Sequence, residues 1–182
     1  VLHEGTSQYF PSNVDFAGEK TPLQIADVNE RFDRELLVNA NLHSSTILII
    51  KRANRAFPII EPILKQYGVP DDFKYLAVIE SALTNAVSPS GAKGVWQFMP
   101  DTAREKGMEV NDIVDERYHL QKSTEAACKY LLAAKEKFGN WTLAAASYNG
   151  GMNGVNKKIE EQQVSDYYDL LLTDETSRYV FR

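Results

Sequence analysis

The apolar and polar residues of the chain recur with a helical period over most of its length. Between Thr21-Pro22 and about Val38, apolar side chains return every three or four residues, which is the spacing of one face of a helix. Strictly alternating patterns, which would predict strands, are scarce, and no internal repeat is visible. We therefore expect a mainly α fold.

Residues 44–67 contain a second long apolar pattern, which is interrupted by Pro58 and Pro62. Each proline removes a backbone donor and its ring crowds the preceding turn, so we expect the helix to kink or split there. Gly68 is expected to end it. The next helix then starts at Pro70-Asp71 and contains Glu80.

Glycines and a capping residue delimit further helices in the second half of the chain. Gly107 and Gly139 follow the segments PDTAREK and LQKSTEAACKYLLAAKEKF, and Asn140 is suited to cap WTLAAASYN. The segments at 165–172 (SDYYDLLL) and 175–182 (ETSRYVFR) also read as helical. We expect residues 1–66 to form an N-terminal extended segment and helical arm, and residues 67–182 to form one helical domain.

Glu80 lies inside one of the most apolar of these segments, AVIESALTN. At about 100° per residue, its side chain falls between those of Leu76 and Ala77, in the middle of an apolar stripe. The opposite side of the helix carries Tyr75, Val78 and Ile79. Only Asp72 and Lys74 are left as a solvent-facing edge, so we expect Glu80 to face protein or a cleft cut into protein.

A carboxylate in such surroundings loses hydration, which raises its pKa toward neutrality. A carboxylic acid that is protonated near neutral pH is what a general acid requires. The alternative is a structural glutamate at a helix C-terminus that pairs with an arginine or lysine from elsewhere. The helix alone does not decide between these two interpretations.

Charge and residue usage narrow the possible partners and cofactors. The net charge of −5 argues against a nucleic-acid partner. The single cysteine, Cys128, lies in an alanine-rich helical segment and is expected to be a small buried apolar side chain. His3, His43 and His119 are scattered and no calcium-binding loop pattern occurs, so we predict no metal and no cofactor.

No apolar run is long enough to span a bilayer and no signal peptide is visible, which favours either a cytosolic protein or a trimmed chain.

Four motifs follow one another in the second half of the chain. They are Glu80-Ser81, the segment GVWQFMP that contains Gln97 and Met99, the segment SYNGG that contains Tyr148 and Asn149, and the segment ETSRY from Glu175 to Tyr179. This ordered set resembles the lytic transglycosylases that have a soluble-transglycosylase-type domain, and it is most similar to the membrane-bound murein transglycosylase D branch of that family. The resemblance implies a lysozyme-like (goose-type) catalytic domain at 67–182, with the helical arm ahead of it.

The resemblance also implies roles for individual residues. Glu80 becomes the catalytic acid, and the following become substrate-binding residues: Ser81, Ser88, Gln97, Met99, Tyr148, Asn149, Glu175 and Tyr179. The side-chain amide of Gln97 suits an N-acetyl group, whereas Phe98 is expected in the core. Glu175 has an equal claim as an acid that stabilises the start of a helix. The loop after Glu80 lacks the proline of the common Glu-Ser-x-x-Asn-Pro pattern, so which serine accompanies the acid stays open.

The implied reaction cleaves the β-1,4 bond between N-acetylmuramic acid and N-acetylglucosamine without water, and it leaves 1,6-anhydromuramic acid ends. Glycosidases that use water ordinarily need two carboxylates, and Asp112, Asp115 and Glu116 lie in a polar stretch that suits loop and capping roles. Two alternatives remain, a goose-type lysozyme that hydrolyses the same bond and a non-catalytic peptidoglycan-binding module.

The expected partner is the glycan strand of peptidoglycan, bound by a monomer. By the resemblance, the protein acts in the bacterial cell envelope on the periplasmic side. Relatives are often attached to the outer membrane through a lipid on an N-terminal cysteine, which this chain lacks.

Overall fold

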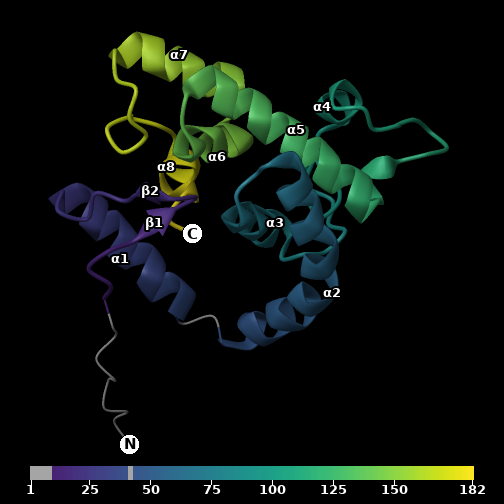
Figure 1. Cartoon of the computed structure of the whole chain (residues 1–182), viewed down its shortest axis with the longest axis horizontal. Helices are drawn as coiled ribbons and strands as arrows, with labels where there is room; N and C mark the ends of the chain where they lie inside the picture. Colours follow the sequence, from purple (N-terminus) through teal and green to yellow (C-terminus); the bar gives the residue numbers. More distant parts are fainter. Residues whose placement is uncertain (1–9, 41–42) are drawn as a thin grey trace, which may run out of the picture.

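The computed structural model describes residues 10–40 and 43–182 and has a mainly α architecture, as predicted (Figure 1). The helices and strands are β1 (Asp15–Phe16), β2 (Glu19–Lys20), α1 (Ala26–Ala40), α2 (His43–Tyr67), α3 (Lys74–Ser81), α4 (Pro100–Glu105), α5 (Leu120–Phe138), α6 (Trp141–Gly150), α7 (Met152–Gln162) and α8 (Asp174–Tyr179). Two short 3-10 helices, Asp71–Phe73 and Glu116–Tyr118, precede α3 and α5.

The main hydrophobic core surrounds α3. Ile60 and Leu64 from α2, Phe73 and Leu76 beside or in α3, and Leu131 from α5 are all almost completely buried in one cluster. Figure 1 shows α3 between α2 and the C-terminal helices, with α5 running across them. The short helix that contains Glu80 is therefore held from several sides.

The sequence located the central helices well. Gly139 adopts a left-handed conformation and ends α5, while the Asn140 side chain accepts a hydrogen bond from the Leu143 amide at the start of α6. Such caps satisfy backbone groups that a helix end leaves unpaired. Cys128 is fully buried, as predicted, and burial raises the pKa of its thiol to about 12.

Of the two outcomes expected at Pro58 and Pro62, a kink or a split, the split does not occur. The helix continues from His43 to Tyr67 across both prolines, although Figure 1 shows its ribbon changing direction along its length. Ile60 and Leu64 flank Pro62 and are buried against α3 and α5. Their packing outweighs the backbone hydrogen bonds that the prolines remove.

The prediction of a helix over residues 165–172 is wrong. The Asp166 carboxylate accepts a hydrogen bond from the Tyr168 amide at 2.8 Å, which favours a turn. The Tyr167 hydroxyl donates to the carbonyls of Thr176 and Ser177 at 2.8 and 2.7 Å. These aromatic residues belong to a second hydrophobic cluster, which also contains Val28 of α1 and Val155 of α7. Helix α7 itself was not predicted.

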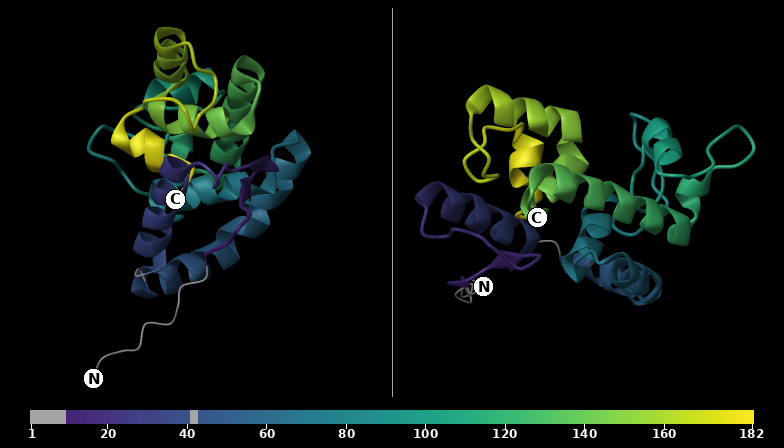
Figure 2. Two further views of the ribbon diagram at one scale, coloured as in Figure 1. Left: turned by 90° about the vertical axis from the view of Figure 1, so that its left-hand side faces the viewer. Right: turned by 45° about the horizontal axis from the view of Figure 1, so that its top comes forward.

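The β1–β2 hairpin of the N-terminal segment joins the starts of two helices. The Ala17 amide donates to the Asp72 carboxylate at 2.8 Å, just before α3. The Glu19 carboxylate accepts hydrogen bonds from the amides of Trp141 and Thr142 and from the Thr142 hydroxyl, at the start of α6. The hairpin and α1 lie beside the C-terminal segment (Figures 1 and 2). The first nine residues of the predicted extended segment lie outside the described residues.

Replacing Glu19 by alanine is expected to lower the free energy of unfolding by about 1–3 kcal/mol, because two amides at the start of α6 would lose a charged acceptor. The measurement is urea unfolding of the two proteins. Lys20→Ala, in the same strand and exposed, is the matched control and is expected to cost less than about 0.5 kcal/mol. Equal effects of the two changes would show that the carboxylate does not stabilise α6.

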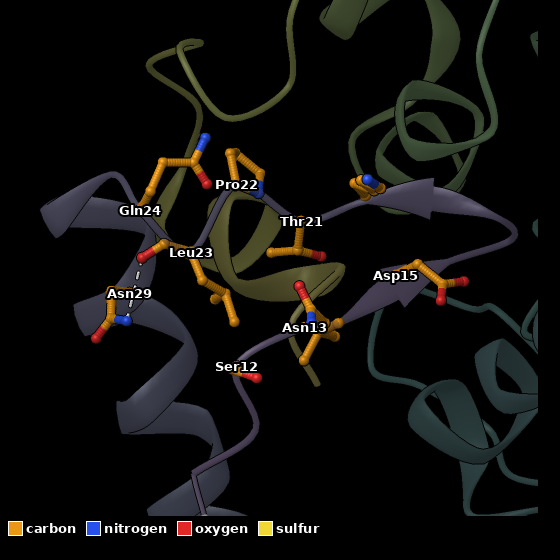
Figure 3. A pocket seen from close by; sticks show the side chains of 10 residues that line it. Ser12, Asn13, Asp15, Thr21, Pro22, Leu23, Gln24 and Asn29 are labelled. Carbon is orange, nitrogen blue, oxygen red and sulfur yellow. Dashed lines mark hydrogen bonds between the residues drawn. The ribbon is translucent and has the colours of Figure 1, made fainter.

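A hollow of about 800 Å³ lies between the hairpin, the turn that follows it and the first turn of α1 (Figure 3). The Asn29 side-chain amide donates to the Leu23 carbonyl at 3.2 Å and so fixes this turn to α1. None of the predicted site residues lines the hollow. Across the ranges 10–40 and 43–182, no helix combines the length and apolar character that crossing a membrane requires.

Candidate active site

Glu80 lies in the last turn of α3 and is partly buried. The Tyr179 hydroxyl, from the end of α8, donates a hydrogen bond of 2.6 Å to Glu80 Oε1. Tyr179 is 1% exposed, so this donor is held within the protein. The partial burial of Glu80 agrees with the prediction from the helical phase that this side chain faces protein or a cleft cut into protein.

The solvent-facing edge of this helix was predicted wrongly. Lys74 is buried, whereas Tyr75 is 51% exposed. The Lys74 ammonium forms ion pairs with Glu61 Oε1 at 2.8 Å and Asp71 Oδ2 at 2.5 Å, and such pairing is the usual condition for burying a charge. A sequence pattern assigns lysine to the surface, because it does not contain the partner that α2 supplies.

Several neighbours act on the pKa of Glu80, and together they raise it. Burial is the largest cause and raises the pKa of Glu80. The Tyr179 hydrogen bond lowers it, because the hydroxyl stabilises the ionised carboxylate. The negative charge of Glu175 raises it and the positive charge of Arg182 lowers it. The direction is the one that the helical phase of Glu80 predicted.

The raised pKa has a consequence for stability that does not depend on activity. The folded protein holds the Glu80 proton more tightly than the unfolded chain does, so wild-type stability falls as the pH rises from the unfolded to the folded pKa. Glu80→Gln has no such titration. We expect its melting temperature to rise relative to that of the wild type as the pH increases above about 4.3, the ordinary pKa of a glutamate. A difference that is constant or shrinks with pH would contradict the raised pKa.

A sharp turn directly follows Glu80. Ala82 and Leu83 both have positive φ, at 51° and 59°, a conformation that costs non-glycine residues roughly 1–2 kcal/mol each. The Ser81 hydroxyl donates to the carbonyls of Ala77 and Val95. Ser81 thus fixes the end of α3 to the loop that contains Gln97.

Ser88 lies further along the same loop. Its hydroxyl accepts a hydrogen bond from the Ala92 amide at 2.9 Å and lies 2.9 Å from the Ser90 hydroxyl. In the part of the chain that the structure describes, the hydroxyl bonded to Glu80 is that of Tyr179, and neither Ser81 nor Ser88 is bonded to this carboxylate.

The Gln97 side chain is part of its own loop. Its amide nitrogen donates to the carbonyls of Ala86 and Gly94 at 3.0 and 2.8 Å, and its backbone has a φ of 53°. The side-chain nitrogen of Gln97 is therefore bonded to backbone carbonyls of its own loop. Phe98 is 4% exposed and lies in the core, as predicted, whereas Met99 is 43% exposed.

Arg117 is buried, and its side chain holds the loop that contains Gln97 through hydrogen bonds. Its guanidinium donates to the carbonyls of Gly91 and Phe98 at 2.9 and 3.1 Å, and it forms an ion pair with Asp115. The Arg117 carbonyl in turn lies against Gly94, where a Cβ atom would come within 2.0 Å of its oxygen. The close approach at Gly94 is therefore made by protein backbone.

Tyr148 and Asn149 end α6 and connect the loop to α8. The Tyr148 hydroxyl donates to the Trp96 carbonyl at 2.7 Å. The Asn149 side-chain oxygen accepts a hydrogen bond from the Thr176 hydroxyl at 2.8 Å. Burial is the largest cause that raises the pKa of Tyr148, and the charge of Glu80 raises it further.

Glu175 is exposed in the first turn of α8. It shares a hollow of about 320 Å³ with Asn149 and Thr176. A second hollow, of about 280 Å³, is lined by Ile79, Tyr179 and Arg182, among others. Glu80 lines neither hollow, and its link to α8 is the hydrogen bond from Tyr179.

The other acids considered from the sequence have different roles. The hydrogen bonds from Arg117 to Asp115 are the main cause that lowers the pKa of this carboxyl to about 2. The Glu116 carboxylate accepts from the Glu109 amide and pairs with Lys122, and Asp112 is exposed. Within residues 10–40 and 43–182, no group of three His, Cys, Asp or Glu side chains is arranged to hold a metal ion.

Sequence reasoning missed three contributors to this site. The Thr176 hydroxyl donates a hydrogen bond to Asn149, and the charge of Arg182 lowers the pKa of Glu80. The Trp96 carbonyl accepts the hydrogen bond of Tyr148. Trp96 and Thr176 lie within the quoted motifs GVWQFMP and ETSRY, which was the available signal. Arg182 had none.

The fold and these motifs define the class of protein. The chain belongs to the family described as Transglycosylase SLT domain, whose model matches residues 57–171. Glu80, Gln97 and Tyr148 lie within this match, and Tyr179 lies beyond it.

Two curated relatives are similar to the chain over almost its whole length. They are the proteins named Membrane-bound lytic murein transglycosylase D from Escherichia coli strain K12 and from Escherichia coli O6:H1, strain CFT073. Each is 29% identical to this chain over 174 residues, which cover 91% of the chain and 38% of the relative. The chain therefore spans well under half of the length of these proteins.

Proposed function

We propose that this chain is the catalytic part of a lytic transglycosylase that cleaves the glycan strands of peptidoglycan, with Glu80 as its single acid and base. The observation that carries the proposal is the partly buried Glu80 carboxylate, which is hydrogen-bonded by Tyr179 and lies within the residues that match the transglycosylase family. The names of the relatives support the same substrate class.

Glu80 acts twice in the proposed reaction. Its neutral carboxyl group protonates the oxygen that bridges N-acetylmuramic acid and N-acetylglucosamine, and the bond from this oxygen to C1 breaks. The 2-acetamido oxygen of the substrate stabilises the positive charge at C1. The Glu80 carboxylate then takes the proton of the C6 hydroxyl, whose oxygen attacks C1 and closes a 1,6-anhydro ring. Glu80 ends protonated, as it began, and no water is consumed.

The balance of forces on Glu80 suits both steps. Burial favours the neutral form that must donate a proton, and the Tyr179 hydroxyl stabilises the carboxylate that forms next. A group that gives and takes a proton works best when its pKa is near the working pH. The raised pKa of Glu80 supports this use of one residue in place of two.

The remaining site residues are proposed to bind the sugars. The Gln97 carbonyl oxygen is suited to accept a hydrogen bond from an acetamido N–H, and exposed Met99 offers apolar contact beside it. Tyr148 and Asn149 shape the floor of the site through their bonds to Trp96 and Thr176. Ser81, Ser88, Glu175 and Tyr179 complete the proposed substrate-binding set.

We further propose that residues 67–182 form the catalytic domain, that residues 1–66 precede it as a supporting arm, and that the protein works as a monomer. We place its action in the bacterial cell envelope on the periplasmic side, attached to the outer membrane through a lipid anchor. The word "membrane-bound" in the names of both relatives supports the attachment. Localisation of the full-length protein by cell fractionation tests it.

Product mass distinguishes the proposed activity from its alternatives. The protein is incubated with purified cell-wall sacculi, and the released fragments are analysed by mass spectrometry. We expect fragments with anhydro ends, each lighter by one water than the hydrolysed fragment. Hydrolysed fragments would instead identify a lysozyme, and binding without release would identify a non-catalytic module.

A further inference from the structure

Tyr179, the hydrogen-bond donor to Glu80, is the last residue of the six-residue helix α8. Its neighbour Arg178 leaves this helix on another side and donates to the Glu35 carboxylate, on α1. Glu35 is 2% exposed and Arg178 keeps 22% of its side chain exposed. A buried carboxylate is therefore connected to the candidate acid through two consecutive residues of one short helix.

Helix α1, which carries Glu35, is held in place by several contacts. Val28 is buried in the second hydrophobic cluster. Arg31 donates to the Tyr168 carbonyl at 2.8 Å and its guanidinium lies 5.3 Å from the centre of the Phe181 ring. The face of α1 that carries Glu35 is thus fixed to the C-terminal segment at several points, before and after α8.

We propose that Glu35 is a positioning residue: by holding Arg178, it fixes the end of α8 and so sets the Tyr179 hydroxyl against the Glu80 carboxylate. The inference rests on the proposed function for the role of Glu80, but the contact itself does not. By this proposal, residues 26–40 contribute to the geometry of the site, although they precede the family match at 57–171.

Positioning and plain electrostatics predict opposite results for Glu80. Removing the negative charge of Glu35, or leaving Arg178 unpaired, would by charge alone favour the ionised form and lower the pKa of Glu80. The Tyr179 hydrogen bond lowers the pKa of Glu80. Loosening α8 would weaken this bond, so the pKa of Glu80 would rise. The other groups that face Glu80 are Glu175 on α8, Arg182 in the C-terminal segment and Tyr148 on α6.

The test is an NMR titration of the Glu80 carboxyl carbon, in protein with isotope-labelled glutamate side chains. Assignment comes from the signal that Glu80→Gln removes. We expect the pKa of Glu80 to rise in Tyr179→Phe and, by a smaller amount, in Glu35→Gln. The exposed Glu30 on the same helix supplies the control, since Glu30→Gln is expected to leave the pKa unchanged.

Arg178→Lys provides a second variant, because lysine keeps a positive charge beside the buried Glu35 carboxylate and so preserves the fold. We expect the pKa of Glu80 to rise here too, since a flexible ammonium does not reproduce the fixed Nε donor. An unchanged or lowered pKa in either folded variant, alongside a rise in Tyr179→Phe, would overturn the proposal. The titration needs no substrate, so its failure is distinct from a failure of the proposed activity.

Discussion

Glu80→Gln is expected to reduce the release of anhydro fragments from purified sacculi by about 10²–10⁴-fold or to below detection, because an amide neither donates nor accepts the proton in the proposed reaction. Glutamine has the size of glutamate and can still accept the Tyr179 hydrogen bond. The variant should therefore fold and bind sacculi. The measurement is the rate of fragment release at a fixed protein concentration.

Two controls make this result specific. Glu105→Gln introduces the same chemical change on the exposed side of α4 and is expected to keep wild-type activity. A cooperative melting transition of Glu80→Gln at neutral pH is the second control, because it shows that a loss of release does not come from unfolding. Wild-type-like release by Glu80→Gln would disprove the assignment.

Gly94→Ala is expected to be among the most destabilising single substitutions in the chain. The backbone of Gly94 has a φ of 84°, and a Cβ atom would lie 2.0 Å from the Arg117 carbonyl oxygen. The left-handed conformation costs roughly 1–2 kcal/mol and overpacking adds about 1–3 kcal/mol, so we expect a loss of about 2–5 kcal/mol in unfolding free energy. Urea unfolding measures it.

Gly91 offers a matched comparison in the same loop. Its φ is 93°, but no atom lies within 4 Å of the position where a Cβ would stand. Gly91→Ala should therefore cost only the conformational part, roughly 1–2 kcal/mol. Equal losses for the two substitutions would mean that the contact with Arg117 carries no weight.

Local patterns predicted the central part of the fold because the relevant signals are local. The caps at Gly139 and Asn140 act on their own helices, and the phase of Glu80 depends only on the residues around it. The expectations that did not hold concern features that depend on contacts with other segments of the chain. Packing from distant segments keeps α2 continuous through Pro58 and Pro62, and the partners of Tyr167 lie about ten residues away along the chain.

The candidate site shows the same division. Its motifs were visible in the sequence, but the contacts that assemble them span long separations. Tyr179 lies 99 residues from Glu80, and Arg178 lies 143 residues from Glu35. Nothing in the spacing of Glu35 distinguishes it from other acids on α1, and Gln97 and Ser81 gave no sign that their side chains fix the loop.

The most direct test of the proposed mechanism is a digestion of sacculi in water enriched in heavy oxygen, followed by mass spectrometry of the fragments. Attack by the C6 hydroxyl uses no water, so we predict unlabelled anhydro ends from the wild type and almost no fragments from Glu80→Gln. Heavy oxygen at the newly formed ends would contradict the account, because it would show that water attacks C1.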